Sequence, residues 1–121
     1  MNESFNGVEL RRHLRVPRNF NMIFYVKDSF DRKQDESYTK DISRGGLRFT
    51  NSQFLESGTR LGMEVKIPYI APRRALMEGL VVSCQGTKSR LVFETGVKFT
   101  SMDPQIDQVL DIIEKHYIKG T

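Results

Sequence analysis

The sequence predicts a small, mainly β domain, an antiparallel barrel or sandwich, followed by a C-terminal helix. Three observations predict it: six short strand-like stretches, turn-forming residues between them, and a change to helical periodicity near the end of the chain. The length of 121 residues allows one domain with one core. Hydrophobic residues make up 38% and charged residues 28%, a balance typical of a globular protein rather than a disordered chain.

The strand predictions rest on the alternation of apolar and polar residues. Residues 61–67 alternate without exception, and residues 91–99 alternate with only Thr95 out of place. Less regular patterns predict four further strands, at 20–26, 38–43, 47–50 and 76–84. Turn-forming residues separate the strands at 28–36, 45–46, 56–59, 68–72 and 86–89. The phenylalanines on these patterns are expected in the core: Phe20, Phe24, Phe49, Phe93 and Phe99.

The last segment has the periodicity of an amphipathic helix, predicted over about residues 103–118. Asp103 fits the N-cap and Pro104 the first helical position. The apolar positions follow the i, i+3, i+4, i+7 rule and are Ile106, Val109, Leu110, Ile112, Ile113 and Tyr117. We expect this helix to lie on the β domain or across its mouth. Residues 1–8 are expected to form a flexible tail, and residues 9–121 a single domain whose β part covers about residues 9–100.

Positive charge is concentrated in one short segment. The chain has 19 Lys and Arg against 15 Asp and Glu, a net charge of +4, and four arginines within eight residues account for all of it: Arg11, Arg12, Arg15 and Arg18. A guanidinium can pair with a phosphate or a purine edge through two hydrogen bonds and can stack on a base. Charge alone is equally compatible with a solvated basic tail.

Patterns for catalysis and metal binding are missing. His13 and His116 lie far apart in the sequence, and neither has a second ligand at metal spacing. Cys84 lies in an apolar run, where a buried, inert thiol is expected. We therefore expect a protein that is not an enzyme and holds no metal or cofactor. The N-terminus lacks a signal-peptide pattern and no window is apolar enough to span a membrane, so we expect a cytoplasmic location.

A second polar segment runs from Asp41 to Gly46. In an extended strand Asp41 and Ser43 project from one face while Ile42 points to the core, and Gly46 lets the backbone come close to a ligand. A carboxylate can accept hydrogen bonds from the N1–H and N2–H₂ groups of guanine, whose O6 and N7 match an arginine. An ordinary turn would use the same residue types.

Taken together, the two segments resemble the PilZ domain family of bacteria. Arg11 and Arg15 match its Arg-x-x-x-Arg motif, and Asp41, Ser43 and Gly46 match its Asp/Asn-x-Ser-x-x-Gly motif. The resemblance covers roughly residues 9–99. It implies a six-stranded antiparallel β-barrel that acts as a receptor for the second messenger cyclic di-GMP (c-di-GMP), with these five residues as the ligand-binding set.

The resemblance also implies a role for each residue. Arg11 and Arg15 would hold the phosphates and the Hoogsteen edge of a guanine. Asp41 would accept from the guanine donors, and Ser43 with the backbone around Gly46 would complete the contact. Secondary contacts are expected from Arg12 and Gly45. Leu10 stands where some relatives carry a further arginine, which favours one ligand molecule per chain.

The expected mechanism is the ordering of a mobile segment. Residues 1–18 are expected to be loosely held without ligand. Binding would fold the Arg11–Arg15 stretch across the barrel face and change the surface that a protein partner contacts, in motility, pilus or polysaccharide machinery. No DNA partner is expected. Two alternatives stay open: a PilZ-like adaptor that binds proteins without a nucleotide, and a barrel that binds single-stranded nucleic acid. The segment Tyr69–Arg74 is a candidate partner surface, although a loop packed against the barrel explains it more simply.

Overall fold

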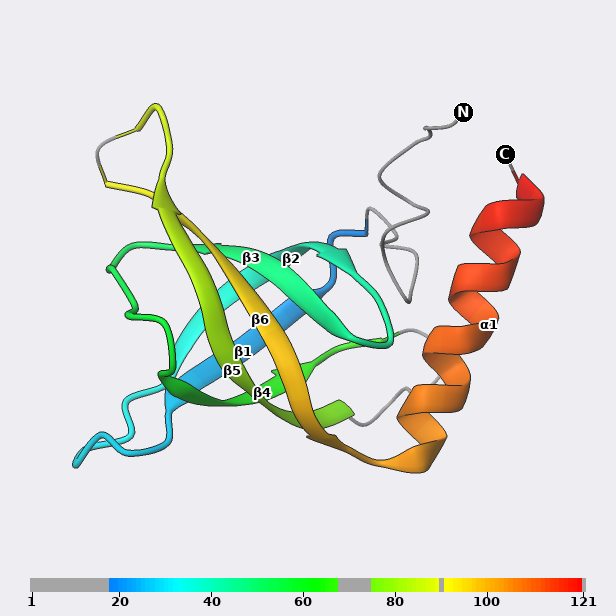
Figure 1. Ribbon diagram of the computed structural model, residues 1–121, viewed down its shortest axis with the longest axis horizontal. Helices are drawn as coiled ribbons and strands as arrows, with labels where there is room; N and C mark the ends of the chain where they lie inside the picture. Colours follow the sequence, from blue (N-terminus) through cyan, green and yellow to red (C-terminus); the bar gives the residue numbers. More distant parts are fainter. Residues whose placement is uncertain (1–17, 68–74, 90, 121) are drawn as a thin grey trace.

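The computed structural model describes residues 18–67, 75–89 and 91–120, and within these ranges it contains six strands and one helix (Figure 1). The strands are β1 (Asn21–Val26), β2 (Asp35–Ile42), β3 (Gly46–Asn51), β4 (Arg60–Val65), β5 (Ala75–Gly86) and β6 (Phe93–Met102). The helix is α1 (Pro104–Gly120).

The strands form a closed antiparallel barrel in the order β1-β2-β3-β6-β5-β4. The barrel closes where β1 pairs with β4, from Met22 opposite Val65 to Val26 opposite Leu61. Closure leaves no strand with a free edge for pairing with another chain. The structure therefore confirms the six-stranded barrel and decides against a sandwich.

Alternate side chains of the strands fill the barrel. Phe24 and Phe49 pack against each other in its interior, with ring centroids 4.7 Å apart. Phe20 and Phe99 are half-buried against the core, whereas Phe93 packs edge-on against Phe54 with ring centroids 6.0 Å apart. The largest fully buried apolar side chains are Phe49, Met22, Ile42, Leu61, Met63, Ile67, Leu110, Val65 and Val81.

Strand β6 departs most from its prediction. It begins at Phe93 rather than at residue 91 and runs on to Met102, and Leu91 is 77% exposed in the preceding turn. Thr95 is fully buried, because its hydroxyl donates to Asn51 Oδ1 at 2.6 Å and so satisfies its polar group inside the barrel. Cys84 was expected to be buried; it is half-buried, and its sulfur contacts the Thr95 hydroxyl at 3.4 Å.

The other boundaries shift by a few residues. Strand β2 starts at Asp35, inside the turn that was predicted to reach Glu36. Strand β5 extends to Gly86, because its partner β6 continues alongside it as far as Phe93. The turn predicted at 68–72 and the candidate surface Tyr69–Arg74 lie outside the described residues, as does the expected tail at 1–8.

Helix α1 packs beside one end of the barrel (Figure 1). The Asp103 carboxylate accepts from the Gln105 amide at 2.8 Å, which confirms Asp103 as the N-cap. Ile106, Leu110 and Ile113 are buried, whereas Ile112, predicted on the apolar face, is 59% exposed, because it lies two residues from Leu110 and so points away from the barrel. No helix among the described residues combines the length and apolar character needed to cross a membrane.

Candidate functional site

The turn between β2 and β3 is built around the Ser43 side chain. The Ser43 hydroxyl oxygen accepts from the backbone amides of Gly45 and Gly46, at 3.1 and 3.3 Å. The Ser43 amide in turn donates to the Gly46 carbonyl oxygen at 2.8 Å. These bonds make a compact turn around a buried serine. The Ser43 side chain therefore holds in place the backbone around Gly46, which was expected to contact a ligand together with Ser43.

Gly46 lies directly against the backbone of β6. A Cβ on Gly46 would lie 2.1 Å from the Val97 carbonyl oxygen and 3.3 Å from the Lys98 Cα, both on the backbone of β6. Gly45 is joined to the same strand, because its carbonyl oxygen accepts from the Phe99 amide at 2.9 Å. The glycine at position 46 is therefore required by the close approach of β6, which holds the turn against the barrel.

Asp41, two residues before Ser43, faces Arg48 across the hairpin. The two residues are register partners on β2 and β3. The Nε and Nη2 groups of Arg48 both donate to Asp41 Oδ2, at 2.8 and 2.5 Å. The other oxygen, Asp41 Oδ1, is buried and has no hydrogen-bond partner within the described residues. A buried carboxylate oxygen without a donor is costly, so this atom marks a place where a ligand donor would be stabilised.

Two further charged residues continue this pair across the outer face of the barrel. Arg48 Nη1 donates to Glu94 Oε1 on β6 at 3.2 Å, and Glu94 also accepts from the Lys40 ammonium group. The hydrogen bond to Asp41 raises the pKa of Arg48 above its ordinary value, with smaller contributions from the charges of Asp41 and Glu94. Arg48 thus stays a cation that forms hydrogen bonds with the carboxylates of Asp41 and Glu94.

The start of the described chain is fixed close to this pair. The Thr39 hydroxyl accepts from the Phe20 amide at 2.8 Å and donates to the Arg18 carbonyl oxygen at 2.5 Å. The Thr39 amide donates to the Phe20 carbonyl oxygen at 2.8 Å. Thr39 lies two residues before Asp41 on β2, so the polypeptide that follows Arg11 and Arg15 enters the barrel beside the candidate site.

An open hollow of about 490 Å³ lies on the outer face there, lined by Asn19, Tyr38, Thr39, Lys40 and Thr50. Its volume is within the range that small-molecule sites occupy. Tyr38 is 56% exposed and offers an aromatic ring at the surface.

Arg44, within the same turn, joins it to α1. Its Nε and Nη2 groups donate to the two oxygens of Asp107, each at 2.9 Å, and its Nη1 group contacts Asp111 at 3.3 Å. The Arg44 amide donates to Glu114 at 3.4 Å. The hydrogen bond to Asp107 is the main reason why the pKa of Arg44 is raised. The three carboxylates occupy one side of the helix, so the turn and α1 form one packed unit (Figure 1).

The structure brings part of the predicted site together. Asp41, Ser43, Gly45 and Gly46 lie on one hairpin, while the arginines predicted at 11, 12 and 15 lie outside the described residues. The sequence reasoning missed Arg48, Arg44 and Thr39. Arg48 could have been found, because a turn over residues 43–46 places position 41 opposite position 48. The roles of Arg44 and Thr39 depend on contacts with segments distant in the sequence.

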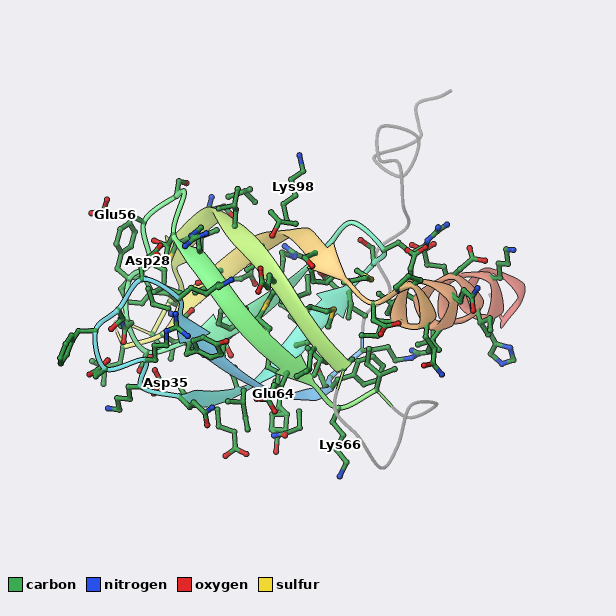
Figure 2. All side chains as sticks on the ribbon, turned by 90° about the horizontal axis from the view of Figure 1, so that it is seen from below. Asp28, Asp35, Glu56, Glu64, Lys66 and Lys98 are labelled. Carbon is green, nitrogen blue, oxygen red and sulfur yellow. The ribbon has the colours of Figure 1, made fainter. Side chains whose placement is uncertain are left out.

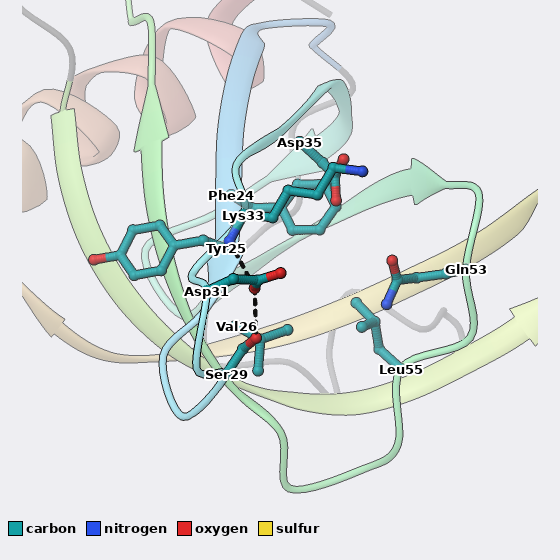
Figure 3. A pocket seen from close by; sticks show the side chains of 9 residues that line it. All are labelled: Phe24, Tyr25, Val26, Ser29, Asp31, Lys33, Asp35, Gln53 and Leu55. Carbon is teal, nitrogen blue, oxygen red and sulfur yellow. Dashed lines mark hydrogen bonds between the residues drawn. The ribbon is translucent and has the colours of Figure 1, made fainter.

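A smaller pocket lies at the other end of the barrel. Figure 2 shows Asp28, Asp35 and Glu56 at the end away from α1. Figure 3 shows the pocket there, about 200 Å³ in volume, where Ser29 donates to Asp31 at 2.9 Å. This hydrogen bond is the main cause of the lowered pKa of Asp31. The pocket is below the range of small-molecule sites and far smaller than a dinucleotide needs.

Among the residues that the structure describes, no group of three His, Cys, Asp or Glu side chains could hold a metal ion. His116 is exposed on α1, as expected for a surface residue.

The model of the PilZ domain family matches residues 9–115, nearly the whole chain. The chain belongs to the PilZ domain family. The arginine motif and the Asp41–Gly46 motif both lie within the matched range, as do all six strands of the barrel. Among curated protein sequences, none is similar enough to this chain to count as a match.

Solved PilZ proteins share the fold. The PilZ domain of YcgR from Escherichia coli, determined with c-di-GMP, gives a TM-score of 0.64 at 14% identity over 91% of this chain and 92% of that one. The inhibitor of motility MotI/DgrA from Bacillus subtilis gives 0.72 at 14% identity, and apo MrkH from K. pneumonia gives 0.68 at 16% identity. They cover 90% and 89% of this chain, which spans 50% of each of those two proteins. At these identities the similarity concerns the fold.

Proposed function

We propose that this PilZ domain is a receptor for cyclic di-GMP and that it holds a guanine of the ligand at the Asp41 carboxylate. The observation that carries the proposal is the buried Oδ1 atom of Asp41, which has no donor in the described structure. The N1–H and N2–H₂ groups of guanine are donors of the kind that this oxygen lacks. Ser43 supports the contact by fixing the turn that follows Asp41.

Chain connectivity supports a part for the arginine motif. Arg18 is bound to Thr39 on β2, and Arg15 precedes it by three residues, which span at most about 11 Å. Arg15 is therefore within reach of the hollow beside Lys40, and Arg11 precedes Arg15 by four residues in the sequence. We propose that both bind the phosphates and the Hoogsteen edge of a guanine, with Arg12 and Gly45 as secondary contacts.

The proposed output is a change in the surface that a downstream protein partner contacts. Ligand binding would order the segment that carries Arg11 and Arg15 across the outer face of β2 and β3. Limited proteolysis between Arg11 and Arg18 tests this step: saturation with c-di-GMP should slow cleavage there. Equal cleavage with and without ligand would mean that the domain signals in another way.

Calorimetric titration tests the receptor function. We expect the wild-type protein to bind c-di-GMP and to bind cyclic di-AMP much more weakly, because adenine lacks the O6 acceptor and the N2 amino group. GTP should also bind more weakly, because it offers one guanine instead of two. Arg15→Ala and Asp41→Ala should each lose about 1.5–3 kcal/mol of binding free energy, a weakening of roughly ten- to a hundredfold. Asp28→Ala, at the other end of the barrel, is the control and should bind as the wild type does. Equal affinity for the guanine and adenine ligands would contradict the proposal.

A further inference from the structure

The contacts of Arg48 assign it a part in ligand recognition that neither sequence motif contains. Arg48 is a register partner of Asp41, and it places two N–H groups on one carboxylate oxygen, Oδ2. An oxygen that accepts two donors from a rigid, planar guanidinium is fixed in position, and the rotation of the carboxylate about its Cβ–Cγ bond is fixed with it.

The same contact leaves Asp41 Oδ1 as the carboxylate oxygen that can still accept a hydrogen bond. Oδ2 has both of its lone-pair positions occupied by Arg48, whereas Oδ1 is buried and has no partner among the residues that the structure describes. Oδ1 carries two lone-pair positions of its own, enough to accept one donor from N1 and one from N2 of a guanine. The carboxylate is therefore held in one orientation before the ligand arrives, which lowers the cost of binding.

Arg48 is itself held on its far side. Its Nη1 group donates to Glu94 Oε1 at 3.2 Å, so its guanidinium bridges β2 and β6. The neighbour of Arg48 on β6 is Gly96, where an added Cβ would lie 3.9 Å from the Arg48 Cγ and 2.6 Å from the Ser83 hydroxyl oxygen. A side chain at position 96 would therefore collide with Ser83, whereas it would meet the Arg48 stem only at an ordinary contact distance.

We propose that Arg48 is a positioning residue for guanine recognition, which orients the Asp41 carboxylate so that Oδ1 accepts from the ligand. The inference rests on the proposed binding of c-di-GMP. It differs from a direct contact between Arg48 and the ligand, because the whole effect of Arg48 passes through Asp41. That difference can be measured.

The experiment is a double-mutant cycle of Arg48→Met and Asp41→Ala, read by calorimetric titration with c-di-GMP up to millimolar concentration. Arg48→Met should weaken binding about tenfold in the wild-type background and less than twofold in the Asp41→Ala background. Arg60→Met is the matched control: Arg60, like Arg48, donates from Nε and Nη2 to an aspartate, Asp28, here one bond to each oxygen at 3.1 and 2.8 Å, but at the other end of the barrel. It should leave the affinity unchanged.

The variant Arg48→Lys distinguishes the effect of Arg48 on the orientation of the carboxylate from the effect of its positive charge. It also provides a second test in case Arg48→Met does not fold. A lysine keeps the positive charge opposite Asp41 but cannot place two fixed donors on Oδ2, so binding should still weaken severalfold. Wild-type affinity in Arg48→Lys, or an equal loss for Arg48→Met in both backgrounds, would overturn the inference while leaving the receptor function intact. Failure of the wild-type protein to bind c-di-GMP would overturn the proposed function and this inference with it.

Discussion

Gly46 illustrates, at the scale of a residue, how the absence of a side chain can fix the candidate site. The backbone of β6 lies where the Cβ of any other residue would be, with the Val97 carbonyl oxygen 2.1 Å away. Asp41 and Ser43, which are both buried, keep one defined place because the hairpin that carries them is held this closely. The glycine in the motif is thus explained by packing alone, before any ligand is considered.

Gly46→Ala should therefore destabilise the fold by about 1–3 kcal/mol, because the backbone of β6 has to move. Gly86→Ala is the matched control, since nothing lies within 4 Å of its added Cβ, and it should change the stability by less than about 0.5 kcal/mol. The midpoint of urea unfolding measures both. Equal midpoints for the two variants would show that the hairpin can shift without cost.

Asp28 and Arg60 form an exposed ion pair whose effect on stability depends on pH. The hydrogen bond from Arg60 is the main reason why the pKa of Asp28 lies below its ordinary value of 3.8. A carboxyl with a lowered pKa in the folded state stabilises the fold above its unfolded pKa. This contribution is lost as the pH falls through the lower, folded value.

The melting temperature of the wild type should therefore fall as the pH drops below about 3.8. Asp28→Asn should flatten this part of the profile without abolishing it, because the pKa of Glu78 is also lowered, mainly by its hydrogen bond with Lys27. Melting temperatures between pH 2 and 6 provide the measurement. Superimposable profiles for variant and wild type would mean that the ion pair does not couple to folding.

At the scale of the element, α1 is held to the barrel by an apolar face and by a charged one. Ile106, Leu110 and Ile113 are buried, while Asp107 and Asp111 contact Arg44 from a neighbouring side of the helix. The apolar contacts provide most of the stability, because ion pairs near the surface contribute little. The charged contacts determine which part of the barrel the helix adjoins, namely the Ser43 turn.

Leu110→Ala should cost about 2–5 kcal/mol of unfolding free energy, because Leu110 is 1% exposed and its removal leaves a cavity. Ile112→Ala, on the same helix but 59% exposed, should stay within about 0.5 kcal/mol of the wild type. Denaturant unfolding compares the pair. A small loss for Leu110→Ala would indicate that α1 detaches without affecting the barrel.

At the scale of the whole molecule, six basic side chains of the described residues form ion pairs with carboxylates. Ion pairs involve Lys27, Lys40, Arg44, Arg48, Arg60 and Lys115. The sequence showed that the chain is neutral once Arg11, Arg12, Arg15 and Arg18 are set aside. The ion pairs of the described residues are consistent with that balance of charge.

The affinity for c-di-GMP should depend only weakly on the salt concentration, because the ligand carries only two phosphates. A ligand with two phosphates predicts a slope of log K against log salt no steeper than about −2, whereas a single strand that contacts six phosphates would give about −4. Titrations between 50 and 300 mM NaCl measure the slope. A steep slope, together with binding of oligonucleotides, would favour the nucleic-acid alternative.

Much of this architecture could be predicted from local sequence patterns. Alternation located the six strands, and Asp103 with Pro104 located the start of the helix, because these signals act within a few residues. The site motif was found for the same reason, since Asp41, Ser43 and Gly46 occupy one short hairpin. The predictions for Leu91 and Ile112 were wrong, since both side chains are exposed. Leu91 lies just before a strand and Ile112 at the border of the apolar helix face, where the packing of neighbouring segments decides which side chains are buried.

The sequence by itself determined the strands, the terminal helix, the segment that holds the excess charge and the residues of the Asp41 turn. Only the tertiary structure decided that the sheet closes through β1 and β4 and that Thr39 fixes the incoming chain beside Asp41. It also decided that Arg48 occupies one oxygen of Asp41, while the other has no partner in the part of the chain that the structure describes. The physical reason is that pairing, closure and the satisfaction of buried polar atoms depend on residues far apart along the chain. No local pattern records where such residues will meet.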